Sequence, residues 1–188
     1  MRTFGIWSES CCRWKPTICL FRDLIHYDRR REKNVDEWGR SWYLYDGEQD
    51  QFAKSLELSA EFIQEVIDNI LNHITASRVA MIGYSMGGYQ AGYFALSRWK
   101  HVNELVVIGG RIKTELFEED ENNYDHLNVL ALHGSDDESV KSSPQQESCN
   151  QLAGWGASVT FNELKESHAL SSVFLQQAKK WLRTLGYG

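Results

Sequence analysis

Three segments of the chain carry residue types that could perform nucleophilic catalysis, and the first of them centres on Ser85. This serine has a glycine two positions before it, Gly83, and another two positions after it, Gly87. A serine held on a very sharp turn has strained backbone angles, and its neighbours at these positions must be nearly free of side chains. Since a serine hydroxyl is a weak nucleophile, it needs a base, and the base needs an orienting acid.

Candidates for the acid and the base follow in that order along the chain. Residues 133–140 read His-Gly-Ser-Asp-Asp-Glu-Ser-Val and provide Asp136, Asp137 and Glu138. Residues 163–170 contain one histidine, His168. Serine, acid and then histidine is one of the chain orders in which such triads occur. The alternative for the first segment alone is a glycine-rich turn without a catalytic role, and agreement among the three segments argues against it.

Short apolar runs and amphipathic stretches predict the elements that would position these residues. The predicted strands are 79–82, 105–108, 127–132 and a weaker one at 157–161, and the predicted helices are about 53–76, 87–99, 144–154 and 172–185. Alternating strands and helices predict a parallel α/β sheet, in which chemistry collects at the carboxyl ends of the strands. Ser143 and Pro144 fit a helix start, and Gly186 fits a helix stop.

Length and charge restrict the class of protein. The 188 residues fit one domain, and a formal net charge of −6 disfavours nucleic acid as a partner. No stretch of the sequence reaches the roughly 18 apolar residues that a membrane span needs. Charged residues such as Glu9 and Arg13 interrupt the region where a secretory signal needs its apolar run, so a cytoplasmic location is expected.

Cysteine and histidine spacing does not indicate a metal site or a disulfide framework. The four cysteines, Cys11, Cys12, Cys19 and Cys149, contain no Cys-x-x-Cys pair and are expected to be reduced thiols. The histidines at 26, 73, 101 and 126 lack the paired spacing of metal ligands, and the acidic run 118–121 lacks the spacing of a calcium loop. His133 is expected to be structural, as part of a His-Gly turn. We expect no metal and no cofactor.

The sequence resembles the phospholipase/carboxylesterase branch of the α/β-hydrolase superfamily, which includes the acyl-protein thioesterases. Residues 83–88 are similar to that branch's Gly-Phe-Ser-Gln-Gly-Gly turn, and 39–43 are similar to its Arg-Ser-Trp-Phe stretch. Its acid loop matches His133-Gly134-x-x-Asp137-x-x-Val140, which selects Asp137 over Asp136. His168 matches the histidine before the final helix. The similarity covers about residues 39–185.

The resemblance implies a three-layer fold, a mostly parallel sheet with helices on both faces, and a specific chemistry. Ser85, His168 and Asp137 would cleave a small-molecule ester or thioester through an acyl-enzyme, and the Met86 backbone N–H would supply one oxyanion donor. Tyr84, Trp42 and Tyr43 would line an acyl pocket, although core packing explains these aromatic residues equally well. The sequence does not predict an oligomeric state.

Residues 1–38 depart from the family pattern. They contain no His-Gly-x-Gly loop, which in the family supplies the second oxyanion donor, so that donor stays unidentified. Loss of one such donor costs about 10²–10³ in rate. We therefore expect a single domain over 1–188 that is reduced or divergent at its N-terminal side, or rebuilt there from residues 17–21. The alternative function is a non-catalytic or impaired relative that binds a small acyl ligand or a protein partner.

Overall fold

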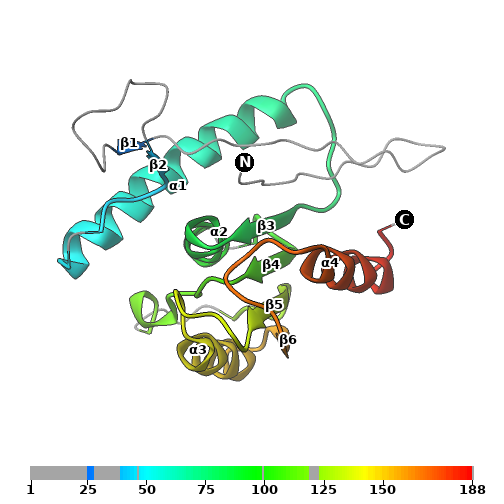
Figure 1. The fold of residues 1–188 in the computed structure, drawn as a ribbon. Helices are drawn as coiled ribbons and strands as arrows, with labels where there is room; N and C mark the ends of the chain where they lie inside the picture. Colours follow the sequence, from blue (N-terminus) through cyan, green and yellow to red (C-terminus); the bar gives the residue numbers. More distant parts are fainter. Residues whose placement is uncertain (1–24, 28–38, 46, 99, 119–122, 188) are drawn as a thin grey trace.

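The computed structural model describes residues 25–27, 39–45, 47–98, 100–118 and 123–187, and its centre is a four-stranded parallel sheet (Figure 1). The strand order is β3-β4-β5-β6, formed by Ala80–Tyr84, Glu104–Ile108, Asn128–Gly134 and Ser158–Leu164. Tyr84 pairs with Ile108, and Gly134 pairs with Leu164. The carboxyl ends of all four strands therefore lie along one edge of the sheet.

The four strands predicted from apolar runs are confirmed, each within a few residues of its expected bounds. Every residue of β4 is buried, because both faces of this central strand are covered. Strand β6 lies at the edge, and exposed residues alternate with partly buried ones along it. That position explains why its apolar signal is the weakest of the four.

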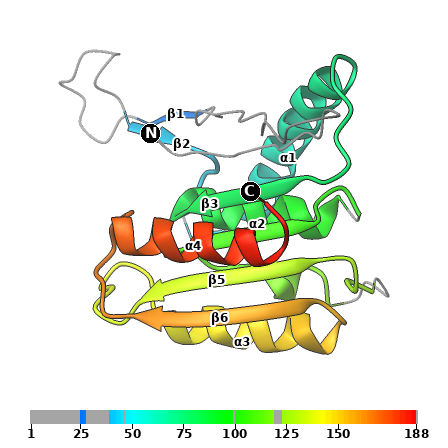
Figure 2. The same ribbon diagram turned by 90° about the vertical axis from the view of Figure 1, so that its right-hand side faces the viewer.

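Helices cover both faces of the sheet, as Figure 2 shows. On one face lie α2 (Met86–Ser97) and α3 (Ser142–Gly154), with α1 (Gln49–Leu71) packed against α2 and the short 3-10 helix η2 (Thr114–Leu116) nearby. On the other face lies α4 (Ser172–Thr184). This arrangement confirms the predicted three-layer α/β architecture.

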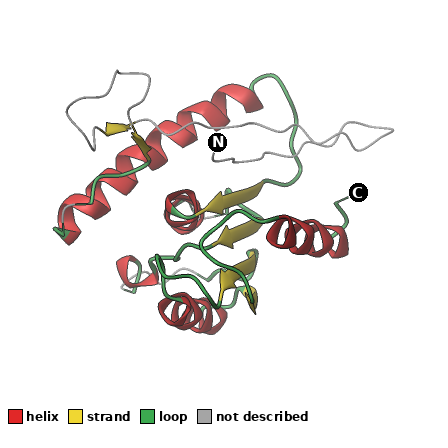
Figure 3. Ribbon diagram, in the orientation of Figure 1, coloured by secondary structure: helices red, strands yellow, loops and turns green. Residues whose placement is uncertain are grey.

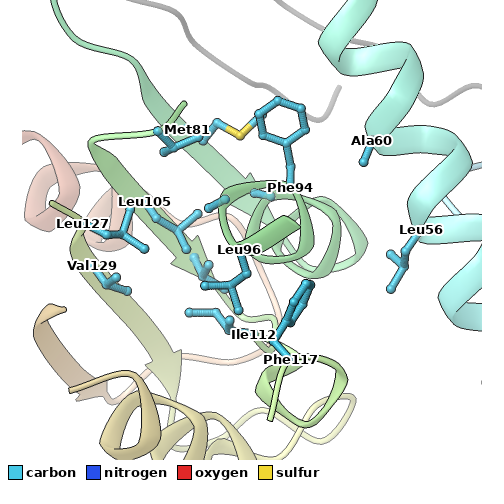
Figure 4. Packing of buried hydrophobic residues seen from close by; sticks show 14 of the residues in the cluster. Leu56, Ala60, Met81, Phe94, Leu96, Leu105, Ile112, Phe117, Leu127 and Val129 are labelled. Carbon is cyan, nitrogen blue, oxygen red and sulfur yellow. The ribbon is translucent and has the colours of Figure 1, made fainter. Parts of the chain in front are cut away.

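Three apolar clusters of described residues fill the spaces between these layers, and two of them contain most of the core. The larger one joins Leu105 and Val129 of the sheet to Phe94 of α2 and to Leu56 of α1 (Figure 4). The smaller one joins the alternate strand residues Val106, Ile108, Leu130 and Leu132 to Phe174 and Ala178 of α4. Side chains alternate between the two faces of a strand, so neighbouring residues of β4 belong to different clusters.

The ends of the helices differ from the expected ones in two places. Helix α1 begins at Gln49 and ends at Leu71, a few residues earlier than predicted at both ends. The predicted cap at Ser143 is wrong, because the extended residue Lys141 precedes the helix and caps it without a side-chain hydrogen bond. Pro144 still lies in the first turn, where a missing N–H costs no helical bond. Gly186, with φ +93°, follows the end of α4 as predicted.

The described N-terminal residues form an antiparallel pair of short strands, β1 (Ile25–Tyr27) and β2 (Gly39–Ser41), separate from the main sheet (Figure 3). The predicted strand at 17–21 lies outside the described residues. After β2 the chain is tied to α1, because the Ser59 hydroxyl donates to the Trp42 carbonyl and the Leu44 N–H donates to Ser55 Oγ over 3.2 Å. In the described part of the chain, no helix combines the length with the apolar character that a bilayer crossing needs.

Candidate active site

Ser85 occupies the tight turn between β3 and α2, at φ 51° and ψ −122°. These angles are unfavourable for a residue with a side chain, and such strain is often found at functional sites. A Cβ at Gly83 would stand 2.1 Å from the carbonyl oxygen of Gly87. The turn, which we call the elbow (residues 83–87), therefore closes only with glycine at position 83.

Gly87 is less constrained than the sequence pattern suggests. Among the described residues, the nearest atom to a Cβ built at Gly87 is Trp42 Nε1, at 3.9 Å. This is an ordinary van der Waals contact. The expectation of a nearly side-chain-free neighbour thus holds for Gly83 and fails for Gly87 within the described part of the structure.

The predicted acid and base both reach the elbow. His168 Nε2 lies 2.9 Å from Ser85 Oγ, and His168 Nδ1 lies 2.7 Å from Asp137 Oδ2. Asp136 and Glu138, the other carboxylates of that loop, are exposed. The structure thus brings Ser85, His168 and Asp137 into one chain of hydrogen bonds, and it places Asp137 rather than Asp136 beside the histidine.

The surroundings of Asp137 favour its charged form. Burial raises its pKa, but hydrogen bonds from His168 and from the backbone N–H groups of Val140 and Ser139 outweigh burial, and the net pKa is lowered. A carboxylate only accepts hydrogen bonds, so His168 Nδ1 carries a proton and donates a hydrogen bond to Asp137. In the neutral imidazole, Nε2 is then free to accept the proton of the Ser85 hydroxyl.

A pair of glycines after β4 lets neighbouring loops approach the elbow closely. A Cβ at Gly110 would stand 2.8 Å from the carbonyl oxygen of Ser85. Gly109 has φ +52°, and a Cβ there would lie 3.6 Å from both Asp137 Oδ2 and His168 Nδ1. Sequence reasoning recognised this pair only as the end of a strand. Its position after an apolar run, at the carboxyl edge of a parallel sheet, was the signal that could have identified it.

The loops that carry the acid and the histidine are held together by backbone contacts. The Asp136 N–H donates to the Glu166 carbonyl over 3.1 Å, and the Ser135 N–H donates to the Leu164 carbonyl over 2.8 Å. A Cβ at Gly134 would stand 2.2 Å from the Glu166 oxygen. The glycine that ends β5, Gly134, is therefore required for close contact between these two loops.

The three aromatic residues expected in a pocket occupy different environments. Tyr84 is partly buried, its ring lies 5.4 Å from the His168 ring, and its hydroxyl donates to the His168 carbonyl over 3.2 Å. Trp42 is fully buried, and Tyr43, at 8% exposure, packs edge-on against Phe52. Both belong to the larger apolar cluster. Core packing thus accounts for Trp42 and Tyr43, whereas Tyr84 flanks the histidine.

Met86 begins α2, so its backbone lies at the positive end of a helix that starts beside the serine. The end of β2 reaches this point, with Ser41 Oγ 3.8 Å from Met86 Sδ. An oxyanion role for the Met86 N–H stays a prediction. The departure from the family loop concerns residues 1–38, of which only 25–27 are described.

The described residues contain no cluster of three or more His, Cys, Asp or Glu side chains that could hold a metal ion. His101 and His126 lie in the segments that precede β4 and β5. His126 is near Lys100, and His101 is near Gln64. Cys149 is buried in α3 with a free thiol, and burial raises its pKa to about 12. The other three cysteines lie outside the described residues.

Comparison with known proteins identifies relatives with the same architecture. A family model described as phospholipase/carboxylesterase matches residues 33–186. A curated mouse protein, lysophospholipase-like protein 1, is 27% identical over 154 residues, which are 71% of this chain and 58% of the mouse protein. The chain thus spans less than two thirds of the length of that relative.

Solved structures support the same fold. A carboxylesterase from Bacillus cereus superposes with a TM-score of 0.69 at 18% identity, over 77% of this chain and 68% of that one. Acyl-protein thioesterase 2 from Zea mays superposes with a TM-score of 0.62 at 19% identity, over 78% of this chain and 73% of that one. At these identities the likeness shows the fold, which is of the α/β-hydrolase type.

Proposed function

This chain belongs to the phospholipase/carboxylesterase family, and from that premise we propose that it hydrolyses carboxylic esters or thioesters of small molecules through Ser85, His168 and Asp137. The single observation that carries the proposal is the continuous chain of hydrogen bonds from Ser85 Oγ through the His168 ring to Asp137, with distances of 2.9 and 2.7 Å. These are distances at which a proton moves between a nucleophile and its base.

The reaction proceeds in two acyl-transfer steps. His168 Nε2 takes the proton of Ser85 as Oγ attacks the carbonyl carbon, and Asp137 stabilises the resulting imidazolium. The tetrahedral oxyanion is held by the Met86 N–H and by a second donor that we do not assign. His168 then gives its proton to the leaving alcohol or thiol, and the acyl group stays on Ser85. Water, deprotonated by the same nitrogen, attacks the acyl-enzyme and releases the acid.

Replacement of the nucleophile tests the proposal. Ser85→Ala is expected to lower kcat for p-nitrophenyl acetate by roughly 10⁴-fold or more, because the attacking atom is removed. It should also abolish covalent labelling by a fluorophosphonate probe, which reacts with activated serines. Thermal unfolding should remain cooperative, since Ser85 is not among the hydrophobic residues that form the apolar clusters.

Ser97→Ala provides the matched control. This serine ends α2, the helix that Ser85 precedes, and its hydroxyl bonds only weakly to the Phe94 carbonyl, over 3.5 Å. We expect unchanged turnover and labelling in this variant. Hydrolysis that survives in Ser85→Ala would refute the proposed nucleophile. A folded wild-type protein that neither hydrolyses esters nor reacts with the probe would favour the non-catalytic acyl-binding alternative.

A further inference from the structure

His133 is a buried histidine next to the proposed acid that the reaction above does not use. It is the penultimate residue of β5, and its side chain has no exposed surface. Its Nε2 lies 2.7 Å from the carbonyl oxygen of Val140 and 3.7 Å from Asp137 Oδ2. A polar ring in this position must satisfy its hydrogen bonds within the protein.

The partners of His133 determine which nitrogen carries a proton. A carbonyl oxygen only accepts hydrogen bonds, so Nε2 is the protonated nitrogen and donates to Val140. The other nitrogen, Nδ1, is buried and has no hydrogen-bond partner among the described residues. A second proton on Nδ1 would therefore be buried without an acceptor. The ring accordingly acts as a hydrogen-bond donor through Nε2.

Val140 connects His133 to the acid. The Val140 carbonyl accepts from His133, and the Val140 N–H donates to Asp137 Oδ1 over 2.9 Å. The Ser139 N–H donates to the same oxygen over 2.8 Å. With Oδ1 occupied in this way, Oδ2 is the oxygen that faces His168. The orientation of the carboxylate thus depends on where residues 139–140 are held.

We propose that His133 is a positioning residue: its N–H fixes Val140 and thereby orients Asp137 toward His168. The proposal rests on the proposed function for its catalytic consequence, but the orientation of Asp137 is measurable without turnover. A purely structural His133 would stabilise the fold without acting through Asp137. Experiments must therefore separate loss of stability from loss of orientation.

Substitutions of His133 by side chains of different length test the role of its N–H donor. In His133→Gln the amide nitrogen can stand near the place of Nε2, and we expect kcat for p-nitrophenyl acetate within about threefold of wild type. In His133→Leu and in the shorter His133→Asn no donor reaches Val140. For both we expect a loss of about 10- to 30-fold in kcat with KM changed less than about twofold, because misplacement of a catalytic group acts mainly on the chemical step.

Gln90→Leu is the control for loss of a buried polar contact elsewhere. Gln90 is fully buried, and its amide donates to the Leu56 carbonyl over 3.1 Å, between α2 and α1. This variant is expected to lose stability in urea unfolding while its kcat stays within about twofold of wild type. Equal losses of kcat in Gln90→Leu and His133→Leu would refute a specific positioning role.

A double-mutant cycle asks whether His133 acts through the acid. In an Asp137→Asn background, His133→Leu should change kcat less than about twofold, because the group that it orients has been removed. A full 10-fold effect in that background would overturn the proposal. If His133→Leu does not fold, His133→Asn takes its place in the cycle.

Proton NMR gives a readout that does not require hydrolysis. The proton between His168 Nδ1 and Asp137 should give a low-field resonance in wild type and in His133→Gln, and this resonance should be lost or shifted in His133→Asn. Retention of an unchanged resonance in folded His133→Asn would overturn the proposal. A protein without esterase activity that still shows the expected NMR difference would refute the proposed function and leave the positioning role intact.

Discussion

An alanine scan of the two elbow glycines should separate a position that cannot hold a side chain from one that can. Gly83→Ala places a Cβ 2.1 Å from the Gly87 carbonyl oxygen, 2.5 Å from its carbonyl carbon and 2.7 Å from the Gly88 nitrogen. All three are backbone atoms, so no side chain can rotate away to make room. Gly87→Ala places its Cβ 3.9 Å from the nearest described atom, the side-chain nitrogen of Trp42.

The size of the effect follows from these distances. Ordinary contact begins at 3.4 Å, so the start of α2 must move by about 1.3 Å to admit the Gly83→Ala methyl group. Overpacking of this kind costs about 1–3 kcal/mol, and a displacement of about 1 Å at a catalytic group costs about 10²-fold in rate. Gly87 is the second residue of α2, where alanine gains less than the roughly 0.5–1 kcal/mol that it gains in a helix interior, so Gly87→Ala should gain up to about 0.5 kcal/mol.

Urea unfolding and p-nitrophenyl acetate hydrolysis measure the two effects separately. We expect Gly83→Ala to lose about 2 kcal/mol of unfolding free energy and about 10²-fold in kcat, and Gly87→Ala to unfold at a higher urea concentration than wild type. The reasoning would be refuted if the two variants had the same unfolding free energy. It would also be refuted if Gly83→Ala kept wild-type stability and rate, since the elbow would then accommodate a methyl group at position 83.

Two further predictions concern stability. Tyr187→Phe removes the hydroxyl that donates to Glu104, a fully buried carboxylate at the amino end of β4 that also pairs with Arg78. Urea unfolding should therefore show a loss of about 1–3 kcal/mol in unfolding free energy, with kcat unchanged. A loss below about 0.5 kcal/mol would contradict this prediction. For Asp137, whose pKa is lowered in the folded protein, the ionised group stabilises the fold above its ordinary pKa of 3.8, and this contribution is lost as the pH falls through the lower native value. The difference in unfolding free energy between wild type and Asp137→Asn should therefore be constant near neutral pH and become smaller below about pH 4. A difference that becomes larger on acidification would contradict this prediction.

The strands of the sheet were predictable because burial on two faces leaves a clear trace in sequence. Strand β4 is buried at every position, and its apolar run marks it without ambiguity. Strands β1 and β2, with three residues each, are too short to show any periodicity, and neither was predicted. The start of α3 was missed because Lys141 caps it through backbone conformation alone, without a hydrogen bond from a characteristic side chain.

The three residues of the candidate site could be selected from the sequence, since each follows a predicted strand, and the structure brings them within hydrogen-bond distance of one another. What the sequence did not reveal is how the loops contact one another. Trp42 and Tyr43 were expected in a pocket or in the core; both are buried in the larger apolar cluster, with Trp42 Nε1 3.9 Å from a Cβ built at Gly87, and a pocket role stays a prediction. The role of His133 depends on its contact with Val140, seven residues further along the chain, and no residue pattern predicts which way that ring turns.

Three glycines set the spacing of the proposed catalytic groups, and only one of them belongs to the Gly-x-Ser-x-Gly pattern that a sequence search would notice. Gly83 lets β3 meet the start of α2, Gly110 lets the loop after β4 meet Ser85, and Gly134 lets the acid loop meet the loop before His168. At each of the three, an added Cβ would stand within 2.8 Å of a backbone carbonyl oxygen. The first two contacts locate Ser85, and the third holds the loop of Asp137 against the loop of His168. The 2.9 and 2.7 Å distances at His168 therefore depend on backbone contacts along the whole carboxyl edge of the sheet, and not on the elbow alone.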